Sequence, residues 1–270
     1  MPELPEVETV RRTLKNFVLD TYIEGVDVYY DKIIEEDIQE FIACVSQQHI
    51  VDIDRFGKYL IFILDDVAFV SHLRMEGKYH IVDKGLPIDK HTHVVFHLDN
   101  GKDLRYMDTR KFGRIKLVDK DLYLQQAPLN KLGLEPFDIS VEQLYEKLHK
   151  TSLPIKTALL DQSIMSGIGN IYANEICFLM GIDPRTKASS LSKKRVQQLQ
   201  EVSSDVLNRA ISQGGTTIHS FDANGIHGLF QVQLNVHGQK VCPKCQGKIK
   251  KIKVNQRGTY YCPSCQKRRY

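Results

Sequence analysis

The first nine residues of the chain, MPELPEVET, place a nucleophile beside a carboxylate. Cleavage of Met1, which a small second residue permits, makes Pro2 a terminal secondary amine that is partly uncharged near neutral pH. Such an amine attacks a sugar carbon and then forms a positively charged iminium, a covalent intermediate of the Schiff-base kind. Glu3 stands next to it and is placed to move protons. The segment therefore predicts covalent catalysis at the start of the chain.

The following residues are typical of a helix that anchors this end. Pro5 suits the first helical position, and Glu6 and Glu8 suit a helix N-terminus. Apolar residues recur at helical spacing, at Val7, Val10, Leu14 and Val18. The alternative is a disordered or solvated terminus, which is the commoner state of a chain end.

Four of the six cysteines have the spacing of a zinc site. Two C-x2-C pairs stand sixteen residues apart and consist of Cys242, Cys245, Cys262 and Cys265. In a cytosolic chain such thiols are metal ligands before they are disulfides, and each pair can aim two thiolates at one tetrahedral Zn²⁺. Four thiolates leave no open position for water, so we predict one structural zinc. Cys44 and Cys177 stand alone in apolar surroundings and suit buried small side chains.

The run PELPEVETVRR closely resembles the N-terminus of bacterial formamidopyrimidine-DNA glycosylases. These enzymes excise oxidised purines, such as 8-oxoguanine and formamidopyrimidines, and cut the strand at the abasic site. The resemblance extends over almost all of the 270 residues. It implies a monomeric, bifunctional glycosylase and abasic-site lyase that acts on double-stranded DNA. In this mechanism Pro2 forms the Schiff base, Glu3 shuttles protons, and β,δ-elimination cleaves the strand.

Three further runs match the family. In RFGKY the resemblance implies that Lys58 faces the catalytic proline and contacts the DNA backbone by the lesion. In SHLRMEGKY and DTRKFG the resemblance implies that Met75, Arg110 and Phe112 enter the space left by the flipped base. An apolar wedge unstacks a base step, and an arginine can occupy the orphaned pairing edge. Ordinary core packing is the alternative for Met75 and Phe112.

The resemblance also implies contacts to the rest of the DNA. His72 and His93 match phosphate contacts, and Lys156 matches a lysine near the damaged nucleotide. In QSIMSGIGNIY two glycines lead into a helix near Asn170, where backbone N–H groups and the helix dipole can receive a phosphate. Arg257, at the tip of the predicted zinc hairpin, matches an arginine that grips a phosphate.

The chain departs from the family pattern at three places. Valine and aspartate are common where Ala173 and Asn174 stand, and glycine is common where Gln246 stands. None of these departures removes a catalytic group. They leave the geometry of the 214–228 lid loop and the ranking among lesions open.

Charge is distributed unevenly along the chain. The net charge is only +4, but no acidic residue follows Asp222, whereas ten basic residues do. Such polarity favours a tail that meets a polyanion, and a solvated tail that aids solubility is the alternative. The chain has no apolar run long enough to span a membrane and no basic secretory segment at its start. We therefore predict a cytoplasmic bacterial protein that is nucleoid-associated when acting.

The elements that must position these groups fall into two classes. Between residues 22 and 118 we predict short strands joined by turns, as in an antiparallel sandwich or barrel; examples are 59–64, 67–70, 93–98 and 113–118. After Ser140 the apolar period becomes helical, over 141–150, 156–161, 170–180 and 192–213. Gly214 and Gly215 end the last helix, and residues 220–228 form a polar loop.

The predicted fold class is α+β with two domains. An N-terminal antiparallel β-sandwich is flanked by helices, and a C-terminal helical domain carries a helix-two-turn-helix element and a zinc-binding β-hairpin. The break near residues 119–139 contains prolines and a glycine and favours a domain boundary. We expect a catalytic sandwich domain over 1–130, a helical DNA-binding domain over 131–230 and a zinc finger over 231–270.

Two other functions stay open. An endonuclease VIII-type glycosylase for oxidised pyrimidines shares the proline, the glutamate and often the zinc finger. It typically has glycine where this chain has Leu4, and it lacks the Met75, Arg110 and Phe112 set. A catalytically silent protein that only binds damaged DNA is the second alternative, and the intact pair of Pro2 and Glu3 argues against it.

Overall fold

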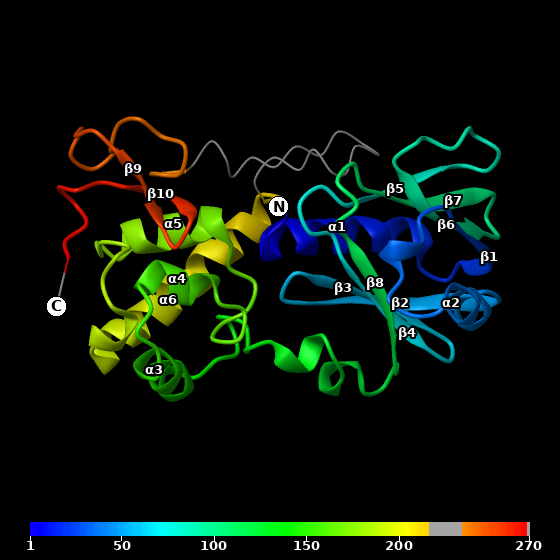
Figure 1. Cartoon of the computed structure of the whole chain (residues 1–270), viewed down its shortest axis with the longest axis horizontal. Coiled ribbons are helices and arrows are strands. Elements are labelled where there is room, and N and C mark those ends of the chain that lie inside the picture. The colour runs from blue at the N-terminus through cyan, green and yellow to red at the C-terminus, as the bar shows by residue number, and fades with distance from the viewer. Residues whose placement is uncertain (216–233, 269–270) are drawn as a thin grey trace. The chain divides into compact units, whose positions relative to one another are not determined.

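A computed structural model describes residues 1–215 and 234–268 (Figure 1). The chain divides into two compact units, whose described parts are residues 1–130 and residues 131–215 with 234–268. The polar loop predicted over residues 220–228 lies outside the described residues. Within the described ranges, every helix is too short or too polar to span a lipid bilayer.

Helix α1 (Leu4–Val18) opens the first unit and begins one residue earlier than predicted. Glu3 is its N-cap, and the Glu6 carboxylate accepts the Glu3 backbone N–H at 2.8 Å as part of a capping box. Pro5 therefore occupies the second helical position, where proline is tolerated because first-turn N–H groups have no intrahelical acceptor. The predicted apolar stripe is buried, at Val7, Val10, Leu14 and Val18.

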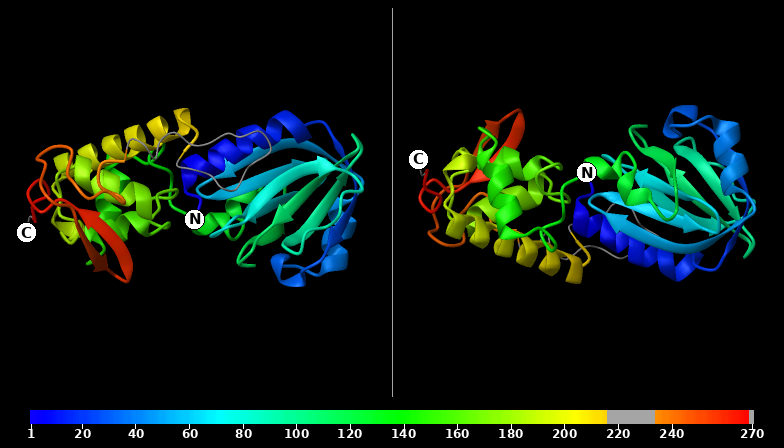
Figure 2. Two further views of the ribbon diagram at one scale, coloured as in Figure 1. Left: turned by 90° about the horizontal axis from the view of Figure 1, so that it is seen from above. Right: turned by 90° about the horizontal axis from the view of Figure 1, so that it is seen from below.

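The strands of the first unit form one antiparallel sheet that is folded into two layers, with the order β5-β7-β6-β1-β2-β3-β4-β8. One layer contains β1 (Tyr22–Val28), β5 (Lys78–Asp83), β6 (Thr92–Leu98) and β7 (Lys102–Met107). The other contains β2 (Gln48–Phe56), β3 (Tyr59–Leu64), β4 (Ala68–His72) and β8 (Arg114–Val118). The layers are joined by a short pairing of Tyr22 with His49 and of Ile23 with Gln48. The predicted antiparallel sandwich is confirmed, and its strands are seen from two sides in Figure 2.

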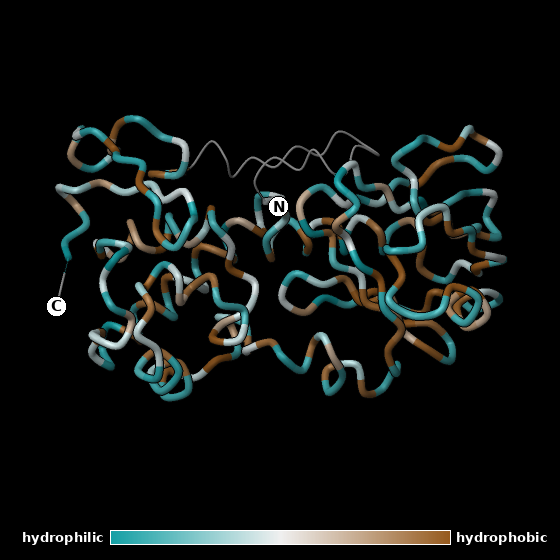
Figure 3. The backbone as a smooth tube through the Cα atoms, viewed as in Figure 1, coloured by the Kyte–Doolittle hydropathy of each residue, from teal (hydrophilic) through white to brown (hydrophobic). Residues whose placement is uncertain are grey.

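Aromatic rings from both layers meet in the core of this sandwich. Phe69 of β4 stacks on Phe62 of β3 with ring centroids 4.6 Å apart, and on Phe96 of β6 at 5.3 Å. Because β4 and β6 belong to different layers, Phe69 bridges them, and such ring pairs contribute about 0.5–1.5 kcal/mol each beyond their burial. Hydrophobic and hydrophilic stretches accordingly alternate along the backbone of this unit (Figure 3).

Helices and short turns complete the first unit. Helix α1 packs on β2 and β3, and α2 (Ile38–Val45) packs on β1. Short 3-10 turns are present at η1 (Asp31–Ile33) and η2 (Tyr123–Gln125), and η3 (Leu129–Lys131) lies at the boundary to the second unit.

The second unit contains helices and one hairpin in its described part. The helices are α3 (Val141–His149), α4 (Ile155–Leu160), α5 (Asn170–Leu179) and α6 (Lys193–Ser212), with a 3-10 turn η4 (Ala188–Ser190). Each predicted helix is confirmed, with its ends shifted by one residue at most. Gly214 and Gly215 follow α6 with φ of 75°, a left-handed conformation that suits glycine. The hairpin consists of β9 (Lys250–Val254) and β10 (Arg257–Tyr261).

Candidate active site

The start of the chain is held against the first unit. Pro2 and Glu3 are buried, whereas Met1 is exposed. The capping box fixes the backbone of Glu3 at the first turn of α1, so the ring of Pro2 is attached to a rigid helix. The predicted alternative of a disordered terminus is therefore wrong for this end of the chain.

A buried carboxylate ties α1 to the sandwich. Glu8 accepts hydrogen bonds from Arg11 at 2.8 Å and from Arg12 at 2.7 Å, both on the same helix. It also accepts one at 3.1 Å from Arg55 on β2, which in turn donates to the Gly57 carbonyl at 3.2 Å. Burial acts to raise the pKa of Glu8, but the hydrogen bonds from the three arginines outweigh it and lower that pKa to about 2. Sequence reasoning assigned Glu8 only to the helix N-terminus and missed this cluster.

Lys58 lies in the tight turn between β2 and β3, where Gly57 adopts a left-handed φ of 58°. Its side chain is buried, which excludes the ordinary solvated lysine of a strand end. The contact of Arg55 with Gly57 places this turn and the Glu8 cluster in one network. The structure thus links the start of α1 to the loop that carries Lys58.

His72 is buried and neutral. Burial, Arg74 and Lys58 lower the pKa of His72 to about 3. Its Nδ1 accepts the Arg74 backbone N–H at 2.9 Å, so the proton of the neutral ring is on Nε2. A neutral Nε2–H can donate one hydrogen bond without the cost of burying a charge, which suits the predicted phosphate contact.

The three residues expected to fill the space of a flipped base lie on two loops. Met75 is 37% exposed and Phe112 is 48% exposed, so the alternative of core packing is wrong for both. The guanidinium carbon of Arg110 lies 4.7 Å from the centroid of the Phe112 ring, which keeps the arginine at the same loop tip. His93 is buried beneath this loop and donates from Nε2 to the Asp108 carbonyl at 2.7 Å.

In the second unit Lys156 is 1% exposed and lies at the centre of a polar cluster. Its ammonium group donates to Asn170 Oδ1 at 2.7 Å, to the Gly258 carbonyl at 2.9 Å and to Thr259 Oγ1 at 2.7 Å. Asn170 begins α5, and Gly258 follows Arg257 on β10. Lys156 therefore holds the N-terminus of α5 and the start of β10 at a fixed spacing. Proximity of this lysine to a damaged nucleotide stays a prediction.

Glu175 is a buried carboxylate that sequence reasoning missed. It accepts hydrogen bonds from the backbone N–H groups of Asn235, Val236 and His237 at 2.7, 3.0 and 2.9 Å, and from the Asn235 side chain at 2.9 Å. It thereby holds the segment that leads into the cysteine-rich region. The available signal was a carboxylate beside Asn174 in a largely apolar helix, since such a group is buried only when it is paired.

Asn174, one of the departures from the family pattern, has a defined role in this structure. It is buried and its Nδ2 donates to His237 Nδ1 at 2.7 Å. Burial, with Lys156 and Lys251 nearby, lowers the pKa of His237 to about 4, so its ring is neutral and can accept that hydrogen bond. Asparagine here adds a second link between α5 and the segment that leads into the cysteine-rich region.

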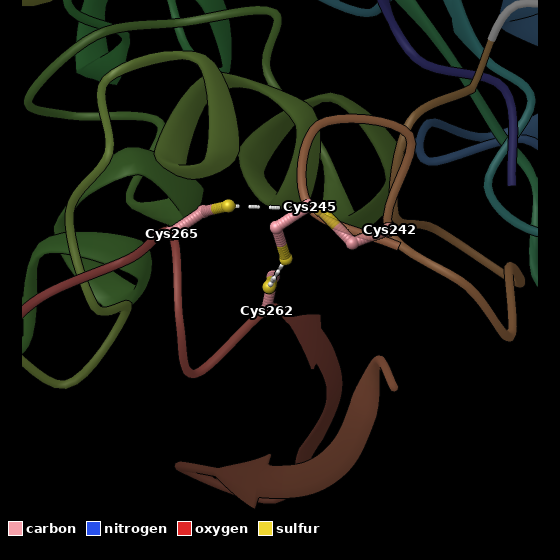
Figure 4. A group of neighbouring side chains, drawn as sticks. All are labelled: Cys242, Cys245, Cys262 and Cys265. Atoms are coloured by element: carbon pink, nitrogen blue, oxygen red, sulfur yellow. Dashed lines mark hydrogen bonds between the residues drawn. The ribbon is translucent and has the colours of Figure 1, made fainter. Parts of the chain in front are cut away.

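The four cysteines come from the two segments that flank the hairpin, one before β9 and one after β10, and their side chains lie close together (Figure 4). All four sulfur atoms lie within 4.8 Å of one another, with Cys242 and Cys265 at 3.7 Å and Cys245 and Cys262 at 3.5 Å. Thiolates at about 2.3 Å from a tetrahedral zinc are separated by distances of this order, so the ligand set fits Zn²⁺. Arg257 is exposed and directly follows the turn formed by Asn255 and Gln256, which places it near the hairpin tip as predicted.

Family comparisons account for nearly the whole chain. Residues 1–115 match the formamidopyrimidine-DNA glycosylase N-terminal domain, residues 132–222 match the H2TH domain of the same enzymes, and residues 239–268 match the zinc finger found in FPG and IleRS. The chain belongs to the formamidopyrimidine-DNA glycosylase family. The match of the third segment, with the four clustered thiols, identifies one structural zinc site of the FPG type.

Curated relatives and solved structures agree with this membership. The chain is 47% identical over 261 residues to formamidopyrimidine-DNA glycosylase from Oceanobacillus iheyensis, covering 94% of this chain and 93% of the relative. It is 42% identical to formamidopyrimidine-DNA glycosylase from Lactobacillus delbrueckii subsp. bulgaricus, and the match covers 99% of this chain and 100% of the relative. The fold is similar, with a TM-score of 0.93 and 36% identity, to a Lactococcus lactis FPG mutant crystallised with Fapy-dG-containing DNA, covering 99% of this chain and 100% of that one. The fold is also similar to the Lactococcus lactis Fpg in complex with abasic-site DNA, with a TM-score of 0.92 and 36% identity. This match covers 98% of this chain and 100% of that one.

Proposed function

We propose that this member of the family is a bifunctional DNA glycosylase and abasic-site lyase that excises oxidised purines, 8-oxoguanine and formamidopyrimidines, from duplex DNA. The observation that carries the proposal is the buried start of α1. Pro2 and Glu3 are held there by the capping box, in one unit with the turn that carries Lys58. A binding protein without catalytic activity has no need of a rigid proline at this position.

The proposed chemistry begins when removal of Met1 frees the Pro2 nitrogen. The nitrogen lone pair attacks C1′ of the damaged nucleotide, a bond forms between nitrogen and C1′, and the glycosidic bond breaks with its electrons passing to the leaving base. Glu3 transfers protons as the sugar ring opens, which leaves an iminium at C1′. The iminium acidifies the neighbouring carbon, so elimination of the 3′ phosphate and then of the 5′ phosphate follows. Zinc takes part in none of these steps.

DNA recognition in this proposal uses both units. Met75, Arg110 and Phe112 enter the space vacated by the base, with Arg110 facing the opposite base. The predicted phosphate contacts are His72, His93, Lys58, Asn170 and Arg257. Lys156 supports two of them, because it hydrogen-bonds Asn170 and the residues next to Arg257. Lactococcus structures of 36% identity that contain Fapy-dG or abasic-site DNA support a damaged-DNA substrate of this kind. We place the activity in the bacterial cytoplasm, on nucleoid DNA, in a monomeric protein.

Borohydride trapping on a duplex with 8-oxoguanine opposite cytosine tests the proposal. We expect a covalent adduct of protein and DNA with processed protein, and none with protein that retains Met1 or carries an N-terminal tag. Mass spectrometry of the purified protein establishes which form is present. Equal trapping by the blocked form would contradict the role of Pro2.

The two alternatives are separated by a second substrate. Release of oxidised pyrimidines such as 5-hydroxyuracil, with no release of 8-oxoguanine, would indicate an endonuclease VIII-type activity. Tight binding to abasic-site DNA without any adduct or strand cleavage would indicate a silent binding protein. The family matches favour the oxidised-purine glycosylase over these two alternatives.

A further inference from the structure

The loops that carry Met75, Arg110 and Phe112, the residues proposed to enter the space of the flipped base, each contain a residue with left-handed backbone. We name residues 73–77 the methionine loop and residues 108–113 the arginine loop. In the first, Arg74 has φ of 52° directly before Met75, and in the second, Lys111 has φ of 59° directly before Phe112. Left-handed backbone at residues other than glycine is strained and persists only where neighbouring contacts enforce it. Both apolar wedges are thus presented by enforced turns.

A buried carboxylate enforces the turn of the arginine loop. Asp108 is fully buried, and its two oxygens accept backbone N–H groups from Arg110 at 2.9 Å, Phe112 at 2.8 Å and Gly113 at 2.9 Å. Its own carbonyl accepts the hydrogen bond from His93. One side chain therefore fixes the backbone of both Arg110 and Phe112 without contacting the space they would fill.

A single tyrosine lies between the two loops. Tyr106 of β7 is fully buried, and a Cβ atom built on Gly113 would lie 1.6 Å from its hydroxyl oxygen. A Cβ atom on Gly77, at the end of the methionine loop, would lie 2.3 Å from the same oxygen. The hydroxyl therefore contacts the end of each loop, and only glycine at both positions leaves room for it.

The Tyr106 hydroxyl does not serve a hydrogen bond within the described part of the chain. It is buried and has no partner among the described residues, although leaving a buried hydroxyl unpartnered is unfavourable. Its neighbour Tyr79, equally buried, donates to Ser71 at 2.8 Å. The loops are also joined by a hydrogen bond from Thr109 to Glu76. Tyr106 thus acts as a spacer that sets the separation of the two loops.

We propose that Asp108 and Tyr106 are positioning residues that determine discrimination of the base opposite the lesion. The inference rests on the proposed function, because it assumes that Arg110 reads this base. The Arg110 guanidinium presents donors only, cytosine offers acceptors at O2 and N3, and adenine offers a donor at its exocyclic amine. A misplaced pair of donors loses about 1–3 kcal/mol of discrimination, roughly tenfold to a hundredfold. Asp108 orients the arginine, and Tyr106 sets its distance from Met75.

Two variants test the proposal with matched controls. Tyr106→Phe removes only the oxygen between the loops, and Tyr79→Phe removes an equally buried hydroxyl that instead donates to Ser71 on β4. Asp108→Asn replaces one acceptor oxygen with a donor that faces backbone N–H groups. Asp103→Asn is its control, because Asp103 is also buried but binds His97 and Arg105 on the same layer. Thermal unfolding of each protein shows whether it is folded, and Tyr106→Phe carries the test where Asp108→Asn does not fold.

The readout is the single-turnover rate of 8-oxoguanine release opposite cytosine divided by that opposite adenine, with cleavage of a preformed abasic site measured in parallel. We expect the ratio to fall at least about fivefold in both variants and to stay unchanged in both controls, while abasic-site cleavage stays within about twofold. An unchanged ratio in Tyr106→Phe and Asp108→Asn, or an equal loss of abasic-site cleavage, would overturn the inference.

A second measurement does not depend on catalysis. Amide hydrogen exchange of Arg110, Phe112 and Gly113 in the free protein should accelerate in both variants and stay unchanged in the controls. Wild-type protein that releases no 8-oxoguanine would contradict the proposed function, whereas unaltered exchange at these amides would contradict the positioning roles even then. The two failures are therefore distinguishable.

Discussion

The sandwich and the zinc hairpin hold their functional residues by different means. In the sandwich, loops and helix ends are fixed by a large apolar core and by buried carboxylates, such as Glu8 with its arginines and Asp108 with its backbone N–H groups. The apolar cluster beneath the hairpin is small, and two of its buried members are metal ligands; it consists of Phe178, Val236, Cys242, Ile249 and Cys262. A segment of this size cannot bury enough apolar surface to fold alone. Metal coordination replaces a core in one region, and paired buried charge supplements a core in the other.

The largest effect on folding and on DNA affinity is expected when the metal is removed from the hairpin. Chelation, or Cys262→Ser, should unfold residues 239–268 because coordination supplies most of their folding free energy. Affinity for an abasic-site duplex should fall about a hundredfold or more, since several basic residues lose their placement together. Amide exchange should accelerate in β9 and β10 and stay unchanged in β3 and β4. Cys44→Ser, at a half-buried cysteine outside the cluster, is the control. Protection of β9 and β10 that survived loss of the metal would contradict the comparison.

The next effect concerns the charged cluster of the sandwich. Glu8→Gln leaves three arginines without their carboxylate, and breaking a buried ion pair costs about 3–5 kcal/mol of unfolding free energy. Urea unfolding should show this loss at pH 7. Glu24→Gln, which removes an exposed carboxylate paired with Lys84, should change little. Equal stabilities of the two variants would show that the apolar core alone fixes α1.

The same cluster predicts a pH dependence. The pKa of Glu8 in the folded protein, about 2, lies below its unfolded value of about 4.3, so the stability it contributes is present above the unfolded value. This stability is lost as the pH falls through the interval from about 4.3 to 2. Unfolding free energies measured across that interval should decline more steeply in the wild type than in Glu8→Gln. Parallel curves for the two proteins would contradict the lowered pKa.

A smaller effect is expected at the hairpin tip. Arg257→Ala removes the proposed phosphate contact from an otherwise intact hairpin, so affinity for abasic-site DNA should fall about threefold to tenfold at moderate salt. The slope of log affinity against log salt should become shallower by about 1. Lys150→Ala, at the exposed residue that directly follows α3, provides a control for simple loss of charge. An unchanged salt slope in Arg257→Ala would exclude the phosphate contact.

The smallest effect tests a departure from the family pattern. Gln246 follows the first cysteine pair with φ of 57°, a conformation that glycine adopts without strain. Gln246→Gly should stabilise the zinc-bound hairpin by about 1 kcal/mol, because the left-handed conformation costs non-glycine residues about that much. Competition with a zinc chelator would measure the change as tighter metal retention. Weaker retention would show that the Gln246 side chain contributes more than its backbone costs.

The amino-acid sequence by itself determined the features that depend on local pattern. The helices over 141–149 and 193–212 follow from an apolar period that is complete within each segment. The strand over 59–64 follows from β-propensity and flanking turns, and the zinc ligands follow from the spacing of four thiols. Family motifs at the chain start indicated the class of enzyme. Each of these patterns involves residues that are close together in sequence, and a short segment of chain can adopt only a few backbone conformations.

Only the tertiary structure decided which groups are positioned by distant partners. Glu8 meets Arg55 across 47 positions, and Lys156 meets Gly258 across 102. No period or spacing encodes such contacts, because a charged side chain in a helix has the same local pattern whether it faces solvent or a buried partner. The exposure of Met75 and Phe112 was likewise undecided, since an apolar residue in a loop suits a core as well as a wedge. The fold resolves these cases because burial in a close-packed interior is tolerated only where each polar group finds its partner.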